Sequence, residues 1–189
     1  MNERADAPAP GSRVHVRPLL TADLDDLFRI QTESCDPAYR ESEAAVLAKL
    51  ALFRAGALGW FDGDALCGYA FALPWRAGTV IPVAHVLEAL PERPDVMYIH
   101  DMVVAPAHRG RGVASALLAE ISRLAVALDL DRLSLVAVQG SEPFWQRSGF
   151  AAAERVEYVP GVTATRMERP AAARPSPPSN IPDSGEHTE

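Results

Sequence analysis

The sequence predicts a single layered domain of the α/β or α+β class with a mixed sheet, and three observations support it. Segments of β-type residues alternate along the chain with segments whose apolar residues recur at helical spacing. With 189 residues, 48% of them hydrophobic, the chain can bury one sizeable core. The two ends, residues 1–11 and 170–189, hold few large apolar side chains, so we expect disordered ends around a domain at 12–169.

The first half of the domain predicts one strand, two helices and a hairpin. In order, these are a strand at 13–17, a helix from Thr21, a helix from Ser42 to Gly56, and strands at 58–61 and 66–73. Thr21 and Ser42 are residues that cap helix N-termini well. Asp62-Gly63-Asp64 between the two later runs is typical of a tight hairpin turn.

The second half predicts four strands and two helices after an irregular, proline-broken segment at 74–95 with one helical turn near 87–90. These are a strand at 96–104, a helix at about 112–129, a strand at 133–138, a helix at 142–147, and strands at 151–159 and 162–167. The long helix is expected to bury Leu117, Ile121, Leu124 and Leu128, which share one face. The resulting order is β-α-α-β-β-β-α-β-α-β-β.

Charge and composition exclude several classes of protein. A net charge of -7 argues against broad nucleic-acid binding, which needs a basic surface. No apolar run approaches the ~20 residues of a membrane helix, and the N-terminus lacks the apolar segment of a secretory signal. Two cysteines can build neither a disulfide framework nor a zinc site of four thiolates. We therefore expect a cytoplasmic protein without a metal.

The most informative stretch is Val103–Ala114, in which a strand runs through a glycine-containing loop into the long helix. Amides in such a loop and in the first helical turn have no intrahelical partners, and the helix dipole adds positive charge. Gly110 and Gly112 allow close approach of the backbone, and Arg109 and Arg111 can donate to phosphate oxygens. The stretch predicts a phosphate site, although a glycine-rich turn can also serve tight packing alone.

Two segments together resemble the GNAT (Gcn5-related) N-acetyltransferases. Arg109–Ala114 fits the R/Q-x-x-G-x-G/A loop that binds the pyrophosphate of acyl-CoA in this family. Ser141–Phe150 (SEPFWQRSGF) is similar to the family's F-Y-x-x-x-G-F segment, with Trp145 in place of tyrosine. The resemblance covers roughly residues 13–168. It implies a mostly antiparallel sheet flanked by helices and splayed at its two central parallel strands.

The resemblance also implies acetyl-CoA as the co-substrate and assigns residues to it. The strand residues 102–104 would expose backbone groups to the pantetheine arm, and an amide near Val103 or Val104 would polarise the thioester carbonyl. Ser141 and Phe144 match positions that line the CoA arm beside the splayed strand. The complete expected set is Met102, Val103, Val104, Arg109, Gly110, Arg111, Gly112, Val113, Ala114, Ser141 and Phe144.

His100 and Asp101, on the same strand, are the candidate catalytic residues. An amine acceptor is mostly protonated at neutral pH, so a base must remove its proton, directly or through water. His100 lies where arylalkylamine-type members of the family carry a histidine, and an imidazole suits proton transfer near neutral pH. Asp101 could take this role instead, or either residue could be purely structural.

Trp145 is the main departure from the family pattern. In many relatives a tyrosine at this place protonates the departing thiolate, and an indole N–H is not a useful acid. Water, Ser141, Tyr98 or Tyr158 could supply the proton instead.

The function that the resemblance implies is transfer of an acetyl group from acetyl-CoA to a primary amine of a small molecule or peptide. One alternative is a non-catalytic acyl-CoA-binding module, a sensor or partner domain, and another is a nucleotide-binding α/β protein. Nucleic-acid and membrane partners are not expected, and a homodimer stays open. The segments expected to contact the acceptor are 31–42 and 74–95, whose acidic residues hint at a cationic acceptor: Asp36, Glu41, Glu88, Glu92 and Asp95.

Overall fold

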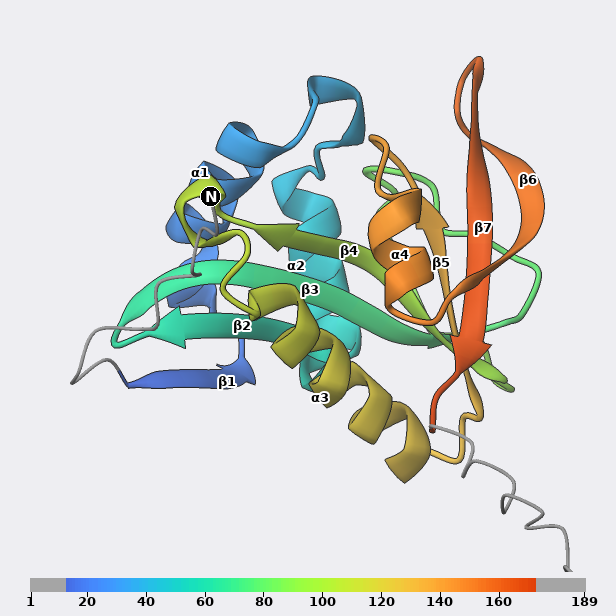
Figure 1. The fold of residues 1–189 in the computed structure, drawn as a ribbon, viewed down its shortest axis with the longest axis horizontal. Coiled ribbons are helices and arrows are strands. Elements are labelled where there is room, and N and C mark those ends of the chain that lie inside the picture. The colour runs from blue at the N-terminus through green and yellow to red at the C-terminus, as the bar shows by residue number, and fades with distance from the viewer. Residues whose placement is uncertain (1–12, 173–189) are drawn as a thin grey trace, which may run out of the picture.

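The computed structural model describes residues 13–172, which form one seven-stranded sheet with helices on both faces (Figure 1). The strands are β1 (Val14–Pro18), β2 (Ala57–Asp62), β3 (Ala65–Trp75), β4 (Val96–Val104), β5 (Arg132–Ala137), β6 (Ala151–Val159) and β7 (Val162–Pro170). The α-helices are α1 (Leu24–Ser34), α2 (Glu43–Leu52), α3 (Val113–Ala127) and α4 (Glu142–Arg147). Their order along the chain confirms the order expected from the sequence.

The sheet has the order β1-β2-β3-β4-β5-β7-β6. Only β4 and β5 pair in parallel, and every other neighbouring pair is antiparallel. This confirms the mostly antiparallel sheet with two central parallel strands. The helix α3 connects these two strands, as a parallel connection requires.

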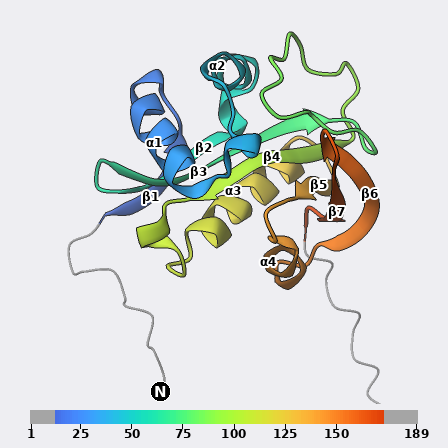
Figure 2. The same cartoon turned by 90° about the horizontal axis from the view of Figure 1, so that it is seen from above.

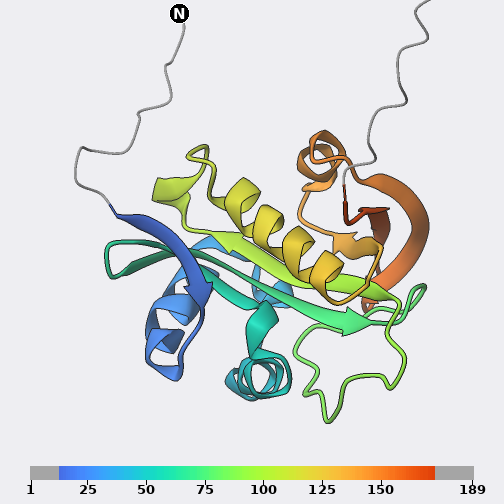
Figure 3. The same cartoon turned by 90° about the horizontal axis from the view of Figure 1, so that it is seen from below.

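The helices divide between the two faces of the sheet (Figures 2 and 3). On one face, Leu27 and Ile30 of α1 and Val46 of α2 pack with Phe61 and Phe71. On the other face, α3 buries an apolar stripe against the central strands, formed by Val113, Leu117, Leu118, Ile121 and Ala125. Full burial of each large side chain stabilises the fold by about 1.5–3 kcal/mol.

A β-bulge interrupts the pairing of β3 with β4. Phe71 lies opposite Asp101 and Ala72 lies opposite Ile99, so His100 is the extra residue. The bulge resets the alternation of side chains along β4. Ile99 packs on the α3 side, whereas the His100 side chain contacts Glu41, between α1 and α2.

The parallel pairing of β4 with β5 is short. It joins Met97 to Leu133, Tyr98 to Ser134 and Ile99 to Leu135, and within residues 13–172 it goes no further. β4 nevertheless continues to Val104, held on its other edge by β3. The edge of β4 that faces β5 is therefore without a strand partner from His100 to Val104, and the expected splay is present.

Four expectations about single elements are wrong. Thr21 does not cap α1, because the chain first makes a 3-10 turn at Thr21–Asp23, in which Asp23 accepts from the Leu20 amide at 2.8 Å and pairs with Arg17 at 2.7 Å. No helical turn forms near 87–90, where Leu87 packs into the core beside Leu73, Ile81 and Tyr98. Leu128 is exposed, because α3 ends at Ala127.

The fourth correction concerns the C-terminal boundary. Pro170 is the last residue of β7, and Ala171 is buried and donates its amide to the Asp131 carbonyl at 2.8 Å. The expected disordered segments otherwise lie outside the described residues. Within 13–172 no helix is long and apolar enough to span a bilayer, and the longest, α3, has 15 residues.

Two truncations test where the domain ends. Removal of 173–189 is expected to leave the melting temperature unchanged, because that segment holds almost no large apolar side chains. Removal of 170–189 also takes away the Ala171 contact, and each kcal/mol lost lowers the melting temperature by about 2–4 °C. Equal melting temperatures for the two truncations, measured by differential scanning fluorimetry, would contradict the new boundary.

Candidate active site

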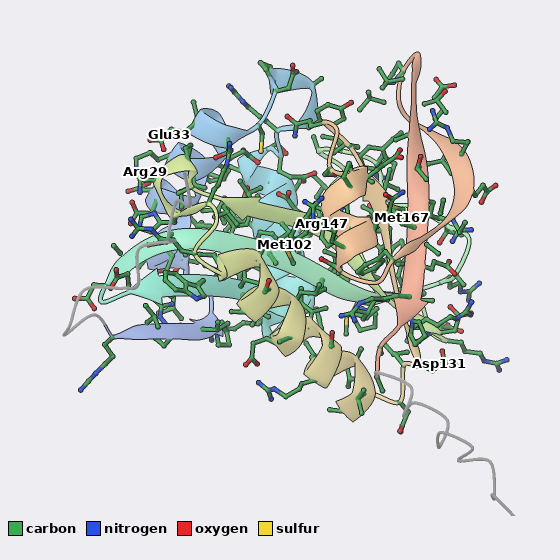
Figure 4. All side chains as sticks on the ribbon, viewed as in Figure 1. Arg29, Glu33, Met102, Asp131, Arg147 and Met167 are labelled. Carbon is green, nitrogen blue, oxygen red and sulfur yellow. The ribbon has the colours of Figure 1, made fainter. Side chains whose placement is uncertain are left out.

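A cavity of about 820 Å³ opens where β4 and β5 separate. Residues Ile99–Val104 of β4 line it. Leu135 of β5, which forms the last parallel pair with Ile99, lines it as well. The loop before α3 and the α1–α2 connection also contribute lining residues. Met102 on β4 and Arg147 on α4 line it from two different elements (Figure 4).

The structure brings almost all the sequence-predicted residues to this one cavity. His100 and Asp101 line it, as do Met102, Val103, Val104, Arg109, Gly110, Gly112, Val113, Ala114, Ser141 and Phe144. Arg111 is the exception, since it does not line the cavity although both neighbouring glycines do. Binding of CoA by these residues stays a prediction. The residues that line the cavity lie close enough together to contact one ligand.

The loop from Arg109 to Val113 has the backbone that a phosphate site needs. Gly110 and Gly112 have φ values of +76° and +81°, in the left-handed region that favours glycine. Gly112 directly precedes α3, and Gly112, Val113 and Ala114 all line the cavity. The unpaired amides of the first helical turn therefore lie beside it. The Arg109 Nε donates to the Val104 carbonyl at 3.4 Å, which ties the loop to the end of β4.

The His100 side chain is 1% exposed and contacts Glu41, whose side chain is 3% exposed. The His100 Nε2 and Glu41 Oε1 atoms are 2.8 Å apart, and Glu41 Oε2 accepts from Lys49 Nζ at 2.7 Å. Burial lowers the pKa of His100 from its ordinary value, although the Glu41 carboxylate acts in the opposite direction. At neutral pH the ring is therefore neutral and able to accept a proton.

Asp101 is half-buried and also lines the cavity. Burial, reinforced by the negative charge of Glu41, raises its pKa to about 7, while Tyr69 acts against this shift. A carboxyl that titrates near neutral pH can act as an acid or a base. The cavity therefore contains two candidate proton acceptors on consecutive residues.

Cys35, at the end of α1, lines the cavity but is not an activated nucleophile. Burial, together with the charge of Asp101, raises the pKa of its thiol to about 11. Because the thiolate is the reactive form, Cys35 is unsuited to carry an acetyl group at neutral pH.

Trp145 is a core residue and not a proton donor. Its ring is 7% exposed and packs edge-on against Phe144 and Phe150. Its indole N–H donates to the Ser141 Oγ at 3.2 Å. Of the hydroxyl groups considered as acids, Ser141 and Tyr158 line the cavity and Tyr98 does not.

The acidic residues expected to hint at a cationic acceptor do not act as a group. Of the five, only Glu41 lines the cavity, and Lys49 already neutralises it. Asp36 caps the short helix at Pro37–Tyr39, and Asp95 accepts from the Ala77 amide. Within residues 13–172 no group of three or more metal-ligating side chains could hold a metal ion.

Sequence reasoning missed Lys49, and it considered Glu41 only as a contact for a cationic acceptor and not as the partner of His100. One signal was available, because Lys49 is the only lysine of the chain and lies within an apolar helix, EAAVLAKLAL. A charged side chain on the buried face of a helix requires a buried partner.

The comparisons with known proteins identify the family to which this fold belongs. The sequence matches the Acetyltransferase (GNAT) family over residues 22–150, more than half of its length, and the protein therefore belongs to this family. No curated protein matches the chain.

Solved structures share the fold at low sequence identity. The loading GNATL domain of CurA from Lyngbya majuscula superposes with a TM-score of 0.75 at 12% identity, covering 84% of this chain and 98% of that one. The GphF GNAT-like decarboxylase in complex with isobutyryl-CoA gives 0.71 at 14%, covering 84% and 100%. The ribosomal-protein-S18-alanine N-acetyltransferase of Escherichia coli gives 0.63 at 15%, covering 87% and 97%.

The loop assignment is tested by Gly112→Asp, which is expected to abolish CoA binding in isothermal titration calorimetry. The substitution places a negative charge, and a side chain at φ +81°, where the diphosphate should lie. Gly78→Asp is the matched control, since Gly78 has φ +75°, an equally open Cβ position and no place in the cavity lining. Arg111→Ala should weaken binding only in part, and native affinity of Gly112→Asp would show that the loop assignment is wrong.

Asp101→Asn tests the raised pKa of Asp101 through stability. The folded-state pKa of about 7 lies above the ordinary value of ~3.9, so the folded protein binds the proton more tightly between these values. Stability therefore falls as pH rises through this window, and the neutral amide should avoid that loss. We expect Asp101→Asn to melt above the wild type at pH 8 and level with it at pH 4. A lower melting temperature at both values would contradict the shift.

Proposed function

We propose that the protein transfers the acetyl group of acetyl-CoA to a primary amine of a small molecule or peptide. One observation carries the proposal: a single cavity connects the glycine-containing loop before α3 with the candidate proton acceptors His100 and Asp101 on β4, along an unpaired strand edge. Membership of the acetyltransferase family supports it.

The unpaired edge of β4 supports a place for the pantetheine arm. Backbone groups of Met102–Val104 can pair with its amides as a further strand would, while the loop amides hold the diphosphate. Ser141 and Phe144, on the opposite wall, would contact the arm. This placement would bring the thioester close to the bulge at His100.

The reaction joins an amine nitrogen to the thioester carbon and breaks the carbon–sulfur bond. A protonated amine first gives one proton to a base, and the neutral nitrogen then attacks. The resulting oxyanion would be stabilised by an amide near Val103 or Val104. The nitrogen loses a second proton as the CoA thiolate leaves and is protonated, giving an amide and free CoA. Binding both substrates side by side supplies much of the rate enhancement.

His100 is the proposed base, because its ring is neutral at neutral pH and its hydrogen bond to Glu41 orients it. Asp101 is the rival on the adjacent residue. For the leaving thiolate we propose Ser141, since the indole of Trp145 donates to its oxygen and leaves the hydroxyl hydrogen for the cavity. Tyr158 is the alternative from β6.

A non-catalytic acyl-CoA-binding module is the second candidate, and the tryptophan at 145 favours it. The GphF relative is a decarboxylase that was solved with isobutyryl-CoA, so this fold also binds acyl-CoA without serving N-acetylation. Thiol release from acetyl-CoA with a panel of amines and peptides separates the two. Binding of acetyl-CoA without thiol release from any amine would favour the module.

The base is tested with His100→Ala and Asp101→Asn in a steady-state assay on an amine from that panel. His100→Ala should lower kcat by about 10²–10⁴ with little change in CoA affinity. A neutral His100 is the active form and its pKa is below the ordinary ~6.5, so activity should fall only as pH drops below that value. An acid limb near pH 7 that disappears in Asp101→Asn would move the role to Asp101, whose pKa is about 7.

A further inference from the structure

Glu41 is the most highly connected buried charge in the site. Its Oε1 contacts His100 Nε2 at 2.8 Å and accepts from the Ala84 amide at 2.9 Å, and its Oε2 accepts from Lys49 Nζ at 2.7 Å. The side chain of Lys49 is fully buried, and those of Glu41 and His100 are 3% and 1% exposed. The carboxylate thus links α2, β4 and the segment after β3.

The position of Glu41 is held on its main chain as well. The Gln31 side chain, on α1, accepts from the Glu41 amide at 2.8 Å and donates to the Glu41 carbonyl at 3.1 Å. Gln31 is itself buried, and its two hydrogen bonds fix the Glu41 main chain, just before α2, to α1. The carboxylate is therefore aimed by residues from several elements and not by its own loop alone.

The charge state of Glu41 determines where the hydrogen of His100 lies. Burial opposes ionisation, but the bonds and charges of His100 and Lys49 outweigh it and lower the pKa of Glu41 to about 2. An ionised carboxylate only accepts hydrogen bonds. The hydrogen of the imidazole must then be on Nε2, and Nδ1 carries the lone pair.

The other ring nitrogen has the properties of a free proton acceptor. The Nδ1 atom of His100 is buried, and no residue within 13–172 forms a hydrogen bond with it. His100 is among the residues that line the cavity while its side chain is only 1% exposed, so a bridging water would carry the proton to Nδ1. An unsatisfied buried nitrogen is unfavourable by about 1–3 kcal/mol, so a water molecule at Nδ1 would be held there and could relay a proton.

We propose that Glu41 is a positioning residue, which holds His100 as the Nε2–H tautomer so that Nδ1 takes the proton of the acceptor amine, while Lys49 balances the charge of Glu41. This inference rests on the proposed function. The proton moves from the ammonium nitrogen to Nδ1, and the Nε2–H bond to Glu41 is kept throughout. The imidazolium that forms is stabilised by the carboxylate and later releases its proton to solvent.

Lys49 explains why the ring is neutral beforehand. A buried carboxylate with no other partner would retain a proton on the imidazole as an ion pair, and a protonated ring cannot act as a base. Lys49 offsets that attraction, so burial of the ring lowers the pKa of His100 and the ring stays neutral. The titratable groups that surround His100 come from five parts of the fold: Glu41, Lys49 on α2, His85 in the segment after β3, Tyr98 and Asp101 on β4, and Tyr158 on β6.

The first measurement is the tautomer of His100 in the full-length protein. Long-range ¹H–¹⁵N correlation spectra distinguish the two ring nitrogens, and the His100 signals are assigned by their loss in His100→Gln. We expect the Nε2–H form at pH 7.5. An Nδ1–H form would overturn the proposal without any further variant.

The second measurement uses two variants that should act in opposite directions. Glu41→Gln retains an oxygen for the Ala84 amide but removes the anion, so the pKa of His100 should fall and kcat should drop about 10- to 100-fold. Lys49→Met removes the cation, so the pKa of His100 should rise and the acid limb of kcat/KM should move to higher pH. Glu41→Asp retains the charge and should recover part of the loss in kcat.

A purely structural role would give a different pattern. Both variants would then lower the melting temperature without moving the His100 titration, or would move it in one direction, and either result would overturn the proposal. If Glu41→Gln does not fold, the tautomer of His100 in the wild type and the titration of His100 in Lys49→Met test the proposal. The spectra need no acceptor, so absence of acetyl transfer would refute the proposed function and leave the Glu41 result standing.

Discussion

The early end of the parallel pairing between β4 and β5 is the constraint on which the site depends. Antiparallel partners hold the outer edge of each strand, β3 along β4 and β7 along β5, while only three residue pairs join the two centrally. Beyond Ile99 and Leu135 the strands diverge, and the gap becomes the cavity. Unpaired backbone groups on the β4 edge need partners, and for this reason the pantetheine arm is proposed to lie along that edge.

The bulge at His100 adds a second constraint, since it places two titratable side chains on one wall of that cavity. The buried ion pair of Glu41 with Lys49 and the neutral ring of His100 then lie together in a region where apolar side chains would usually give more stability. Buried ion pairs contribute little net stability, because desolvation offsets their attraction. Their presence at the junction of α1, α2 and β4 is consistent with the proposed role of His100 as a proton acceptor, and not with a role in stability alone.

Much of the fold could be predicted because its signals are local. The strand at 96–104, the helix after Gly112 and the hairpin at Asp62-Gly63-Asp64 each follow from residues adjacent in sequence. The errors arose where a tertiary contact outweighed a local preference. Asp23, paired with Arg17, replaces the expected cap at Thr21, and packing of Leu87 against the core replaces a helical turn.

The site divides in the same way. The sequence by itself determined the glycine-containing loop before the long helix, the two titratable residues on β4 and the family, because each is recognised from short contiguous segments. Only the tertiary structure decided that Glu41 contacts His100 across 59 positions of sequence, that Lys49 is buried beside it, and that Trp145 belongs to the core. A hydrogen bond between residues far apart in sequence depends on how the helices pack on the sheet. That packing cannot be predicted from the residues adjacent to either partner.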